Sequence, residues 1–225
     1  MANRKSSFAI GEHYHVYNRG VDKRITFTDE YDIRRFFQSM VQFNTNDPIG
    51  SLYENSFLQL GGETPKLGEK LVNIIAYCLN PNHFHLILEQ LVDGDISEFM
   101  KRLGGGYTGY FNKKYERSGS LFQGVFKDVH IDSNEYLLHV SAYVNLNDRV
   151  HKLGNQLGGE TPKLVRSMSS WGEYTDKRIK GICEREIILG QFKNIKEYKK
   201  FALSSLETIV KRKEELRNIS EFLLE

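Results

Sequence analysis

The stretch LVNIIAYCLNPNHFHLILE, residues 71–89, decides the fold. Its first part, residues 71–79, is apolar and rich in strand formers, which indicates a buried β-strand. Asn80-Pro81-Asn82 is a turn sequence, and residues 83–89 resemble a returning strand. The stretch therefore predicts an antiparallel β-hairpin.

The second strand of this hairpin contains His83-Phe84-His85. Residues two apart on a strand point to the same face, so both imidazoles project together while Phe84 enters the core behind them. Two neutral imidazoles make half of a divalent-metal site, and one oxygen ligand would complete a protein face with open positions for substrate. His-x-His pairs also occur without a metal.

Outward from the hairpin, local patterns predict further strands and helices. Residues 14–18 alternate and predict a strand that ends at Arg19-Gly20, and residues 121–131 resemble another strand. Asp29 is a candidate N-cap for a helix that runs to about Asn44. Asp132 or Ser133 could cap a later helix.

The remaining segments complete the predicted order. A helix is expected over residues 96–103, then a break at Gly104-Gly105-Gly106, then a second helical stretch through Tyr115. A charged helical tail is expected from about Asn194 to Leu224. Strands and helices mixed around an antiparallel hairpin indicate the α+β class, with helices packed on one face of the sheet.

Tyr143 and Asn147 are four residues apart on a predicted helix, so they share one face. Asn147 could supply the third metal oxygen and so hold Tyr143 beside the cation. A free phenol has a pKa near ~10, and a nearby cation favours the phenolate and polarises a phosphate under attack. In the alternative interpretation Tyr143 is a core aromatic and Asn147 a helix C-cap.

The charge distribution is more informative than the net charge of +2. A basic stretch from Lys101 to Lys127 is interleaved with aromatic residues, a pattern that suits single-stranded nucleic acid, where cations meet phosphates and rings stack on bases. The alternative is a solvated helix face whose rings turn into the core. The predicted DNA contacts are Arg19, Lys23, Arg24, Tyr107, Tyr110, Lys113, Lys114 and Arg117.

Four segments in order resemble the single-tyrosine HUH transposases, both the insertion-sequence type and their repeat-associated relatives. They are YHVYNRG at 14–20, AYCLNPNHFHLIL at 76–88, YFNKKYERSGSLFQG at 110–124 and YVNLN at 143–147. SSWGEY at 169–174 resembles the family's later Trp/Ser/Tyr element. The resemblance covers about residues 10–175.

This resemblance implies a ferredoxin-like fold, with a catalytic domain over residues 1–175 and a helical C-terminal extension over 176–225. It implies His83 and His85 as ligands of Mg²⁺ or Mn²⁺, Asn147 as the third ligand and Tyr143 as the nucleophile. It also implies a 5′-phosphotyrosine intermediate and a free 3′-hydroxyl. The family usually has Pro after that Asn, whereas Asp148 follows here and could join the metal shell or be solvated.

The expected partner is single-stranded or hairpin DNA, with a homodimer as an open alternative. No apolar run approaches the ~18 residues of a membrane span, and the N-terminus lacks a signal peptide, so a cytoplasmic protein without a membrane partner is expected. Cys78 lies in an apolar run and is expected to be a small core residue.

The octapeptide LGGETPKL occurs twice, at residues 60–67 and 157–164, in predicted loops with different neighbours. It is too short to be a structural repeat. Its codons can form a perfect inverted repeat, so we hypothesise that both copies are traces of palindromic DNA inside the gene. Chance duplication of a loop is the alternative.

Three other functions compete with strand transfer. A catalytically silent DNA-binding protein would keep the fold but has no need of His83, His85 and Tyr143 together. A hydrolase that uses metal-bound water would leave Tyr143 and the basic stretch unexplained. A replication-initiating or relaxase-type HUH nickase would share the chemistry, but the short chain and the motif order favour the transposase branch.

Overall fold

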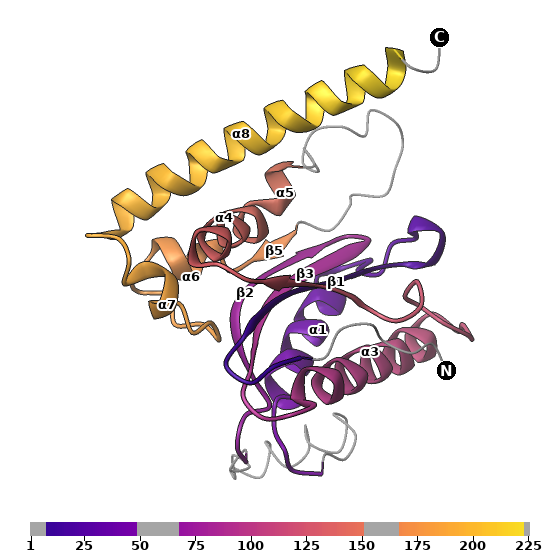
Figure 1. Cartoon of the computed structure of the whole chain (residues 1–225). Coiled ribbons are helices and arrows are strands. Elements are labelled where there is room, and N and C mark those ends of the chain that lie inside the picture. The colour runs from indigo at the N-terminus through magenta and orange to yellow at the C-terminus, as the bar shows by residue number, and fades with distance from the viewer. Residues whose placement is uncertain (1–7, 49–67, 151–166, 223–225) are drawn as a thin grey trace.

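The computed structural model describes residues 8–48, 68–150 and 167–222, and it centres on one antiparallel sheet (Figure 1). The sheet has five strands in the order β4-β1-β3-β2-β5. Their bounds are β1 His13–Arg19, β2 Val72–Asn80, β3 His83–Gln90, β4 Lys127–Ile131 and β5 Met168–Ser169. The predicted hairpin of β2 and β3 is confirmed, with Asn80 paired to His83 across the turn.

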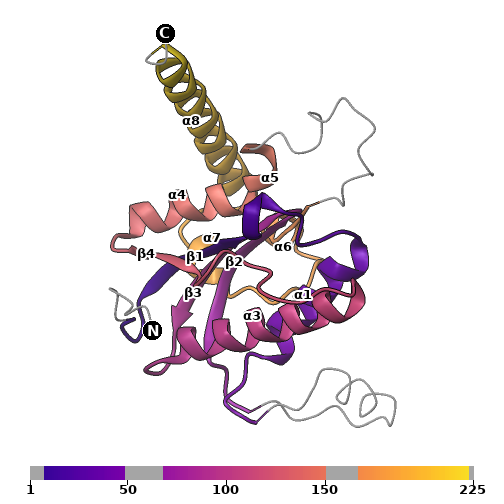
Figure 2. The ribbon, with the colours of Figure 1, turned by 90° about the vertical axis from the view of Figure 1, so that its right-hand side faces the viewer.

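Helices cover both faces of this sheet, as Figure 2 shows from the side. Their bounds are α1 Glu30–Gln42, α3 Asp95–Lys114, α4 Asn134–Asn145, α5 Asn147–Val150, α6 Trp171–Thr175, α7 Glu186–Leu189 and α8 Ile195–Phe222, with a 3₁₀ turn at Val21–Lys23. The predicted α+β class is confirmed. The prediction that helices pack on one face is wrong, because α1 and α3 cover one face and α4 and α8 the other.

Strand alternation explains why the sheet needs two covers. On β3, Phe84, Leu86 and Leu88 enter the core beneath α1 and α3. Ile87, on the other face of the same strand, enters a second core with residues of α4 and α8. A strand that buries apolar side chains on both faces must have helices on both. His83 and His85 alternate with Phe84 and therefore lie on the α4 face.

The two predicted helix starts are confirmed by their caps. The Asp29 side chain accepts a hydrogen bond from the backbone N–H of Asp32 at 2.9 Å, which fixes the start of α1. Ser133 accepts from the N–H of Tyr136 at 3.3 Å at the start of α4. In both cases the side-chain oxygen satisfies an N–H that the helix cannot pair internally.

The predicted break at residues 104–106 is wrong, because α3 runs without interruption through all three glycines. Its buried face, which includes Leu103, Tyr107 and Phe111, continues across them. A Cβ on Gly106 would lie 2.6 Å from Cε2 of Phe43, so this glycine lets the helix pack closely. Tertiary packing therefore outweighs the low helix propensity of glycine.

The strand predicted over residues 121–131 is shorter than expected. β4 begins only at Lys127, although Phe122 forms an isolated bridge with Gly20. Gly124 has φ of +68°, a left-handed conformation that interrupts an extended strand. The irregular segment before β4 lies beside the end of β1, where Gly20 pairs with Phe122, so it contributes to the cleft described below.

The C-terminal region adds to the second core rather than standing apart from the sheet. Ile188 of α7 and Tyr198 and Ala202 of α8 are fully buried there with residues of α4. The predicted tail helix is confirmed as α8, while the division into domains at residue 175 stays a prediction. Both octapeptide copies lie outside the described residues. Among the described helices, none is long and apolar enough to cross a membrane.

Candidate active site

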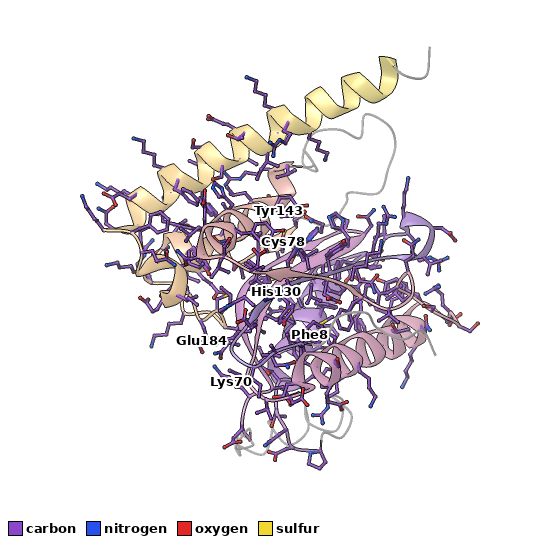
Figure 3. The ribbon with its side chains drawn as sticks, viewed as in Figure 1. Phe8, Lys70, Cys78, His130, Tyr143 and Glu184 are labelled. Carbon is purple, nitrogen blue, oxygen red and sulfur yellow. The ribbon has the colours of Figure 1, made fainter. Side chains whose placement is uncertain are left out.

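The two histidines of β3 and the tyrosine of α4 meet on one face of the sheet. The rings of His83 and His85 are perpendicular, with centroids 5.2 Å apart. The Tyr143 ring lies edge-on to His85, at 5.5 Å between centroids. Figure 3 shows Tyr143 where α4 faces the sheet. Residues 60 positions apart in the sequence therefore form one cluster, as the sequence predicted.

A cleft of about 440 Å³ opens at this cluster. Its walls come from the ends of β1 and β3, from the segment before β4 and from α4. The lining residues are Tyr17, Asn18, Arg19, Asn82, His83, Phe84, His85, Gln123, Lys127 and Tyr143. The cleft thus combines the histidines and a tyrosine hydroxyl with two cationic side chains, Arg19 and Lys127.

Asn147 lies beside His83, although not on the helix that carries Tyr143. α4 ends at Asn145, and Asn147 begins the short α5. The side chain is fully buried, with Oδ1 3.3 Å from Nε2 of His83. Burial raises the pKa of the Tyr143 phenol, and a side-chain hydrogen bond with Asn147 opposes that shift, so the predicted proximity is kept despite the break.

Hydrogen bonding fixes which nitrogen of His83 can bind a cation. Nδ1 is 2.6 Å from Oδ1 of Asn82, an atom that can only accept, so Nδ1 carries the proton and Nε2 a lone pair. Oδ1 of Asn147 is likewise an acceptor, because it receives a hydrogen bond from Nδ2 of Asn80 at 2.8 Å. Two acceptors only 3.3 Å apart therefore point at the same region.

This arrangement fits a divalent cation. Two ligands at about 2.1 Å from an octahedral ion, at right angles, are about 3.0 Å apart, close to the 3.3 Å observed. The Asn80 amide donates to Nε2 of His83 at 2.9 Å as well as to Asn147, so an N–H group occupies the point at which both acceptors aim. That amide stands in for a positive charge.

His15 of β1 also lies at this site, although the sequence pattern did not predict a functional role for it. Its Nε2 is 2.8 Å from Nδ1 of His85, and its side chain is buried. Burial lowers the pKa of His15 to about 4, so the ring is neutral near pH 7 and its Nε2 can accept a hydrogen bond from the Nδ1–H of His85. That tautomer leaves Nε2 of His85 as a lone pair for a cation.

Burial sets the protonation states of the other two groups. It lowers the pKa of His83; the hydrogen bond to Asn147 opposes this, and the positive charges of Arg19 and Lys213 reinforce it. It raises the pKa of Tyr143, with the Asn147 hydrogen bond again opposing. His83 is therefore neutral near pH 7, the form that can bind a cation, and the tyrosine stays protonated unless a cation favours its phenolate.

The candidate third ligand, Asn147, is an amide rather than a carboxylate. Within the described ranges, no group of three or more His, Cys, Asp or Glu side chains could hold a metal ion. Asp148 lines a different pocket with Arg149 and Trp171, so it does not join the histidines. Cys78 is fully buried, as predicted, and burial raises the pKa of its thiol.

The predicted DNA contacts fall into two regions. Arg19 lines the cleft and donates to Oε1 of Gln123 at 3.3 Å. Lys23 and Arg24 lie in and after the 3₁₀ turn that follows β1. Lys113 and Arg117 lie at and beyond the end of α3, on the opposite face of the sheet, and their DNA contacts stay predictions.

Three of the predicted contacts are structural instead. Tyr107 is fully buried and its hydroxyl donates to the backbone oxygen of Thr26 at 2.6 Å, so it cannot stack on a base. Tyr110 and Lys114 both bind Asp32, at 3.0 and 2.8 Å. The Tyr110 hydroxyl and the Lys114 ammonium group bind Asp32 because its carboxylate is fully buried in α1 and needs partners.

Comparisons with known proteins found a matching family and a similar fold. Residues 65–147 match the model of the IS200-like transposase family, a segment that contains both histidines, Tyr143 and Asn147. A solved structure of a REP-associated tyrosine transposase bound to a REP hairpin has a similar fold. Its TM-score is 0.54 at 14% identity, over 81% of this chain and 90% of that chain. No curated protein matches the chain.

Proposed function

We propose that this chain, whose residues 65–147 match the IS200-like transposase family, cleaves and rejoins single-stranded DNA through Tyr143. The observation that carries the proposal is the convergence of Nε2 of His83 and Oδ1 of Asn147, 3.3 Å apart, beside the edge-on ring of Tyr143. A binding protein would not need buried acceptors aimed at one point next to a hydroxyl.

Tyr143 acts as the nucleophile in this mechanism. Its hydroxyl oxygen forms a bond to the phosphorus while the bond to the 3′-oxygen breaks. The phenol proton passes to solvent and the leaving 3′-oxygen takes a proton from solvent, so the products are a 5′-phosphotyrosine and a free 3′-hydroxyl. The phosphotyrosine bond retains the free energy of the phosphodiester bond that was broken. A 3′-hydroxyl from another strand can therefore attack the phosphotyrosine and release Tyr143.

His83, His85 and Asn147 are the residues that would hold the divalent cation, Mg²⁺ or Mn²⁺. When bound, that ion supplies charge neutralisation at the scissile phosphate and favours the phenolate form of Tyr143. The residues around them do the positioning: Asn82 and His15 fix the tautomers of the two ligand histidines.

Arg19 and Lys127 would contact the DNA backbone on either side of the reacting phosphate. Both line the same cleft as Tyr143. Lys23 and Arg24 would extend this contact beyond the end of β1. Positive side chains beside the phosphate position the strand for in-line attack, which is where most of the acceleration of phosphoryl transfer arises.

We propose hairpin-forming DNA as the substrate, in line with the REP hairpin bound by the transposase of similar fold. The described residues of one chain bring the histidines and Tyr143 together, so this site does not require a second copy. A homodimer would then serve DNA pairing rather than completion of the active site.

A covalent-capture assay tests the proposed function. The protein, Mg²⁺ or Mn²⁺, and labelled single-stranded DNA from the gene's flanks and its own palindromes are separated on denaturing gels. A shifted band is expected that needs the metal ion and disappears with Tyr143→Phe. The matched control is Tyr17→Phe, which removes a second hydroxyl from the same cleft, where the Tyr17 ring lies 5.7 Å from His85.

The other functions predict different bands. Cleavage without an adduct, unaffected by Tyr143→Phe, would indicate a metal-bound water nucleophile and contradict the proposal. DNA binding without cleavage across all of these sequences would indicate a silent binding protein. An adduct that is lost with Tyr17→Phe instead would place the nucleophile on β1.

A further inference from the structure

A second groove, about 960 Å³ in volume, begins at Tyr143 and runs between α4 and α8. Tyr143 lines both this groove and the histidine cleft, so the two adjoin at the proposed nucleophile. Figure 1 shows α8 passing over α4, with its far end extending away from the sheet. No step of the proposed mechanism uses this groove.

Buried contacts hold the two walls of the groove in place. Tyr198 and Ala202 of α8 are fully buried, and the Tyr198 hydroxyl accepts a hydrogen bond from Nδ2 of Asn145 at 2.8 Å. Further along, Oγ of Ser205 is 3.2 Å from Nδ1 of His139 on α4. The spacing of α4 and α8, and so the width of the groove, is therefore set by packing in the folded chain.

The part of α8 that lines the groove is basic. Residues 195–213 contain six Lys or Arg and two Asp or Glu, a net charge of +4, whereas the whole chain carries +2. Lys200 and Arg212 are exposed and line the groove. Glu197 is the one carboxylate in the lining, and it already accepts from the backbone N–H of Lys193 at 3.1 Å. The groove favours a polyanion.

Aromatic rings line the same groove. Tyr136 on α4 is 39% exposed, enough for its ring to meet a ligand. Phe201 on α8 is half-buried, and its ring centroid is 5.1 Å from that of His139. Rings beside cations in a groove are the combination that binds unpaired nucleotides, because bases stack while phosphates pair with Lys and Arg.

We propose that this groove binds the single-stranded DNA segment that flanks the scissile phosphate, and so makes α8 part of the DNA-binding surface. The proposal rests on the proposed function, because the strand is placed by its continuity with Tyr143. An unpaired strand fits better than a duplex, since stacking on Tyr136 and Phe201 needs exposed base faces.

The test is the affinity of the full-length protein for 5′-fluorescein-(dT)₂₀, measured by fluorescence anisotropy over a range of salt concentrations. EDTA is present, so binding is read without cleavage. The test variant is Lys200→Ala/Arg212→Ala. The matched control is Lys196→Ala/Lys211→Ala, which removes the same charge from exposed positions of the same helix that do not line the groove.

The groove variant is expected to bind at least about tenfold more weakly than wild type at moderate salt. Its slope of log K against log salt should be smaller by about 1.4, because two phosphate contacts to a single strand are lost. The control should stay within about twofold of wild type. Tyr136→Leu, which removes a stacking ring without changing charge, should weaken binding with no change in slope.

Equal affinities of the two double variants would overturn the proposal, as would the absence of (dT)₂₀ binding by wild type. The adduct assay separates this result from the proposed function. An adduct in wild type together with equal variant affinities rejects only the groove. Weakened binding by the groove variant, in a protein that never forms an adduct, supports the groove and rejects the phosphotyrosine mechanism.

Discussion

Beneath α1 and α3, one face of the sheet holds aromatic rings and cations around a buried carboxylate. Asp32 accepts hydrogen bonds from Tyr110, Lys114 and Tyr115 at 2.8 to 3.0 Å. Beneath α4, the other face holds two histidines and a tyrosine, and Nε2 of His83 and Oδ1 of Asn147 lie 3.3 Å apart. The first group compensates a buried charge, whereas the second brings together two acceptors that share the Asn80 amide.

This difference shows that residue types alone do not locate a nucleic-acid site. Both faces contain rings and positive charges, but among the described residues the α4 face connects them to a cleft that holds both histidines and Tyr143, the proposed nucleophile. On the α1/α3 face the charges compensate each other within the fold. On the α4 face the proposed function assigns that compensation to a metal ion and DNA.

The largest expected effect is on catalysis at the α4 face. The double variant His83→Ala/His85→Ala should reduce metal-dependent adduct formation by at least about a thousandfold, because the cation's charge stabilisation is worth several kcal/mol. The rate of adduct formation on labelled DNA measures it. The control is His130→Ala, which removes an exposed histidine of β4 that is hydrogen-bonded to Glu12, and it should not change the rate. Comparable losses in both would contradict the assignment.

The next effect is on stability at the α1/α3 face. Asp32→Ala should lower the free energy of unfolding by about 3–5 kcal/mol, since it leaves the hydroxyls of Tyr110 and Tyr115 without their acceptor and breaks one of the two ion pairs of Lys114. Urea denaturation measures the change. At temperatures where the variant is folded, adduct formation should match wild type. A loss of activity with unchanged stability would show that this network belongs to the active site.

A smaller effect is expected from pH on the buried His15. Its pKa is about 4 in the folded state against an ordinary value of 6.5, so the unfolded chain binds more protons between these values and stability falls as pH falls from 6.5 to 4. By pH 5 the loss from this group is about 2 kcal/mol. His15→Gln should remove that share of the pH dependence. Parallel stability curves for both proteins would contradict the neutral, buried state.

The smallest effect separates two adjacent glycines of α3. Gly105→Ala should stabilise the protein by about 0.5–1 kcal/mol, because a Cβ there meets nothing within 4 Å and alanine favours the helix. Gly106→Ala should destabilise it by about 1–3 kcal/mol, because its Cβ would overlap the Phe43 ring. Thermal unfolding of both variants measures the difference. The same sign for both would mean that Gly106 has no packing role.

Local patterns predicted much of this molecule because their causes are local. The caps Asp29 and Ser133, the β2–β3 hairpin and the shared face of His83 and His85 depend on residues within a few positions of each other. Non-local contacts decided the rest. Gly106 stays helical because of Phe43, 63 positions earlier in the chain, where the sequence alone predicted a break.

The same limit applies to the site. His15 sits in a strand motif that was recognisable, but its role depends on the pairing of β1 with β3, which the local pattern does not give. The basic-aromatic pattern predicted DNA contacts for Tyr110 and Lys114. It could not show that both bind Asp32, which lies about 80 positions earlier in the chain. Burial of that carboxylate, rather than the basic-aromatic pattern, determines what they bind.

Mapping the DNA-linked residue tests the central claim most directly. After adduct formation the protein is digested with trypsin and nuclease, and the modified peptide is identified by tandem mass spectrometry. The account predicts a nucleotide 5′-phosphate on Tyr143, within residues 128–149, rather than on Tyr136 of the same peptide. Attachment at Tyr136 or Tyr17, or DNA cleaved with no modified tyrosine, would contradict it.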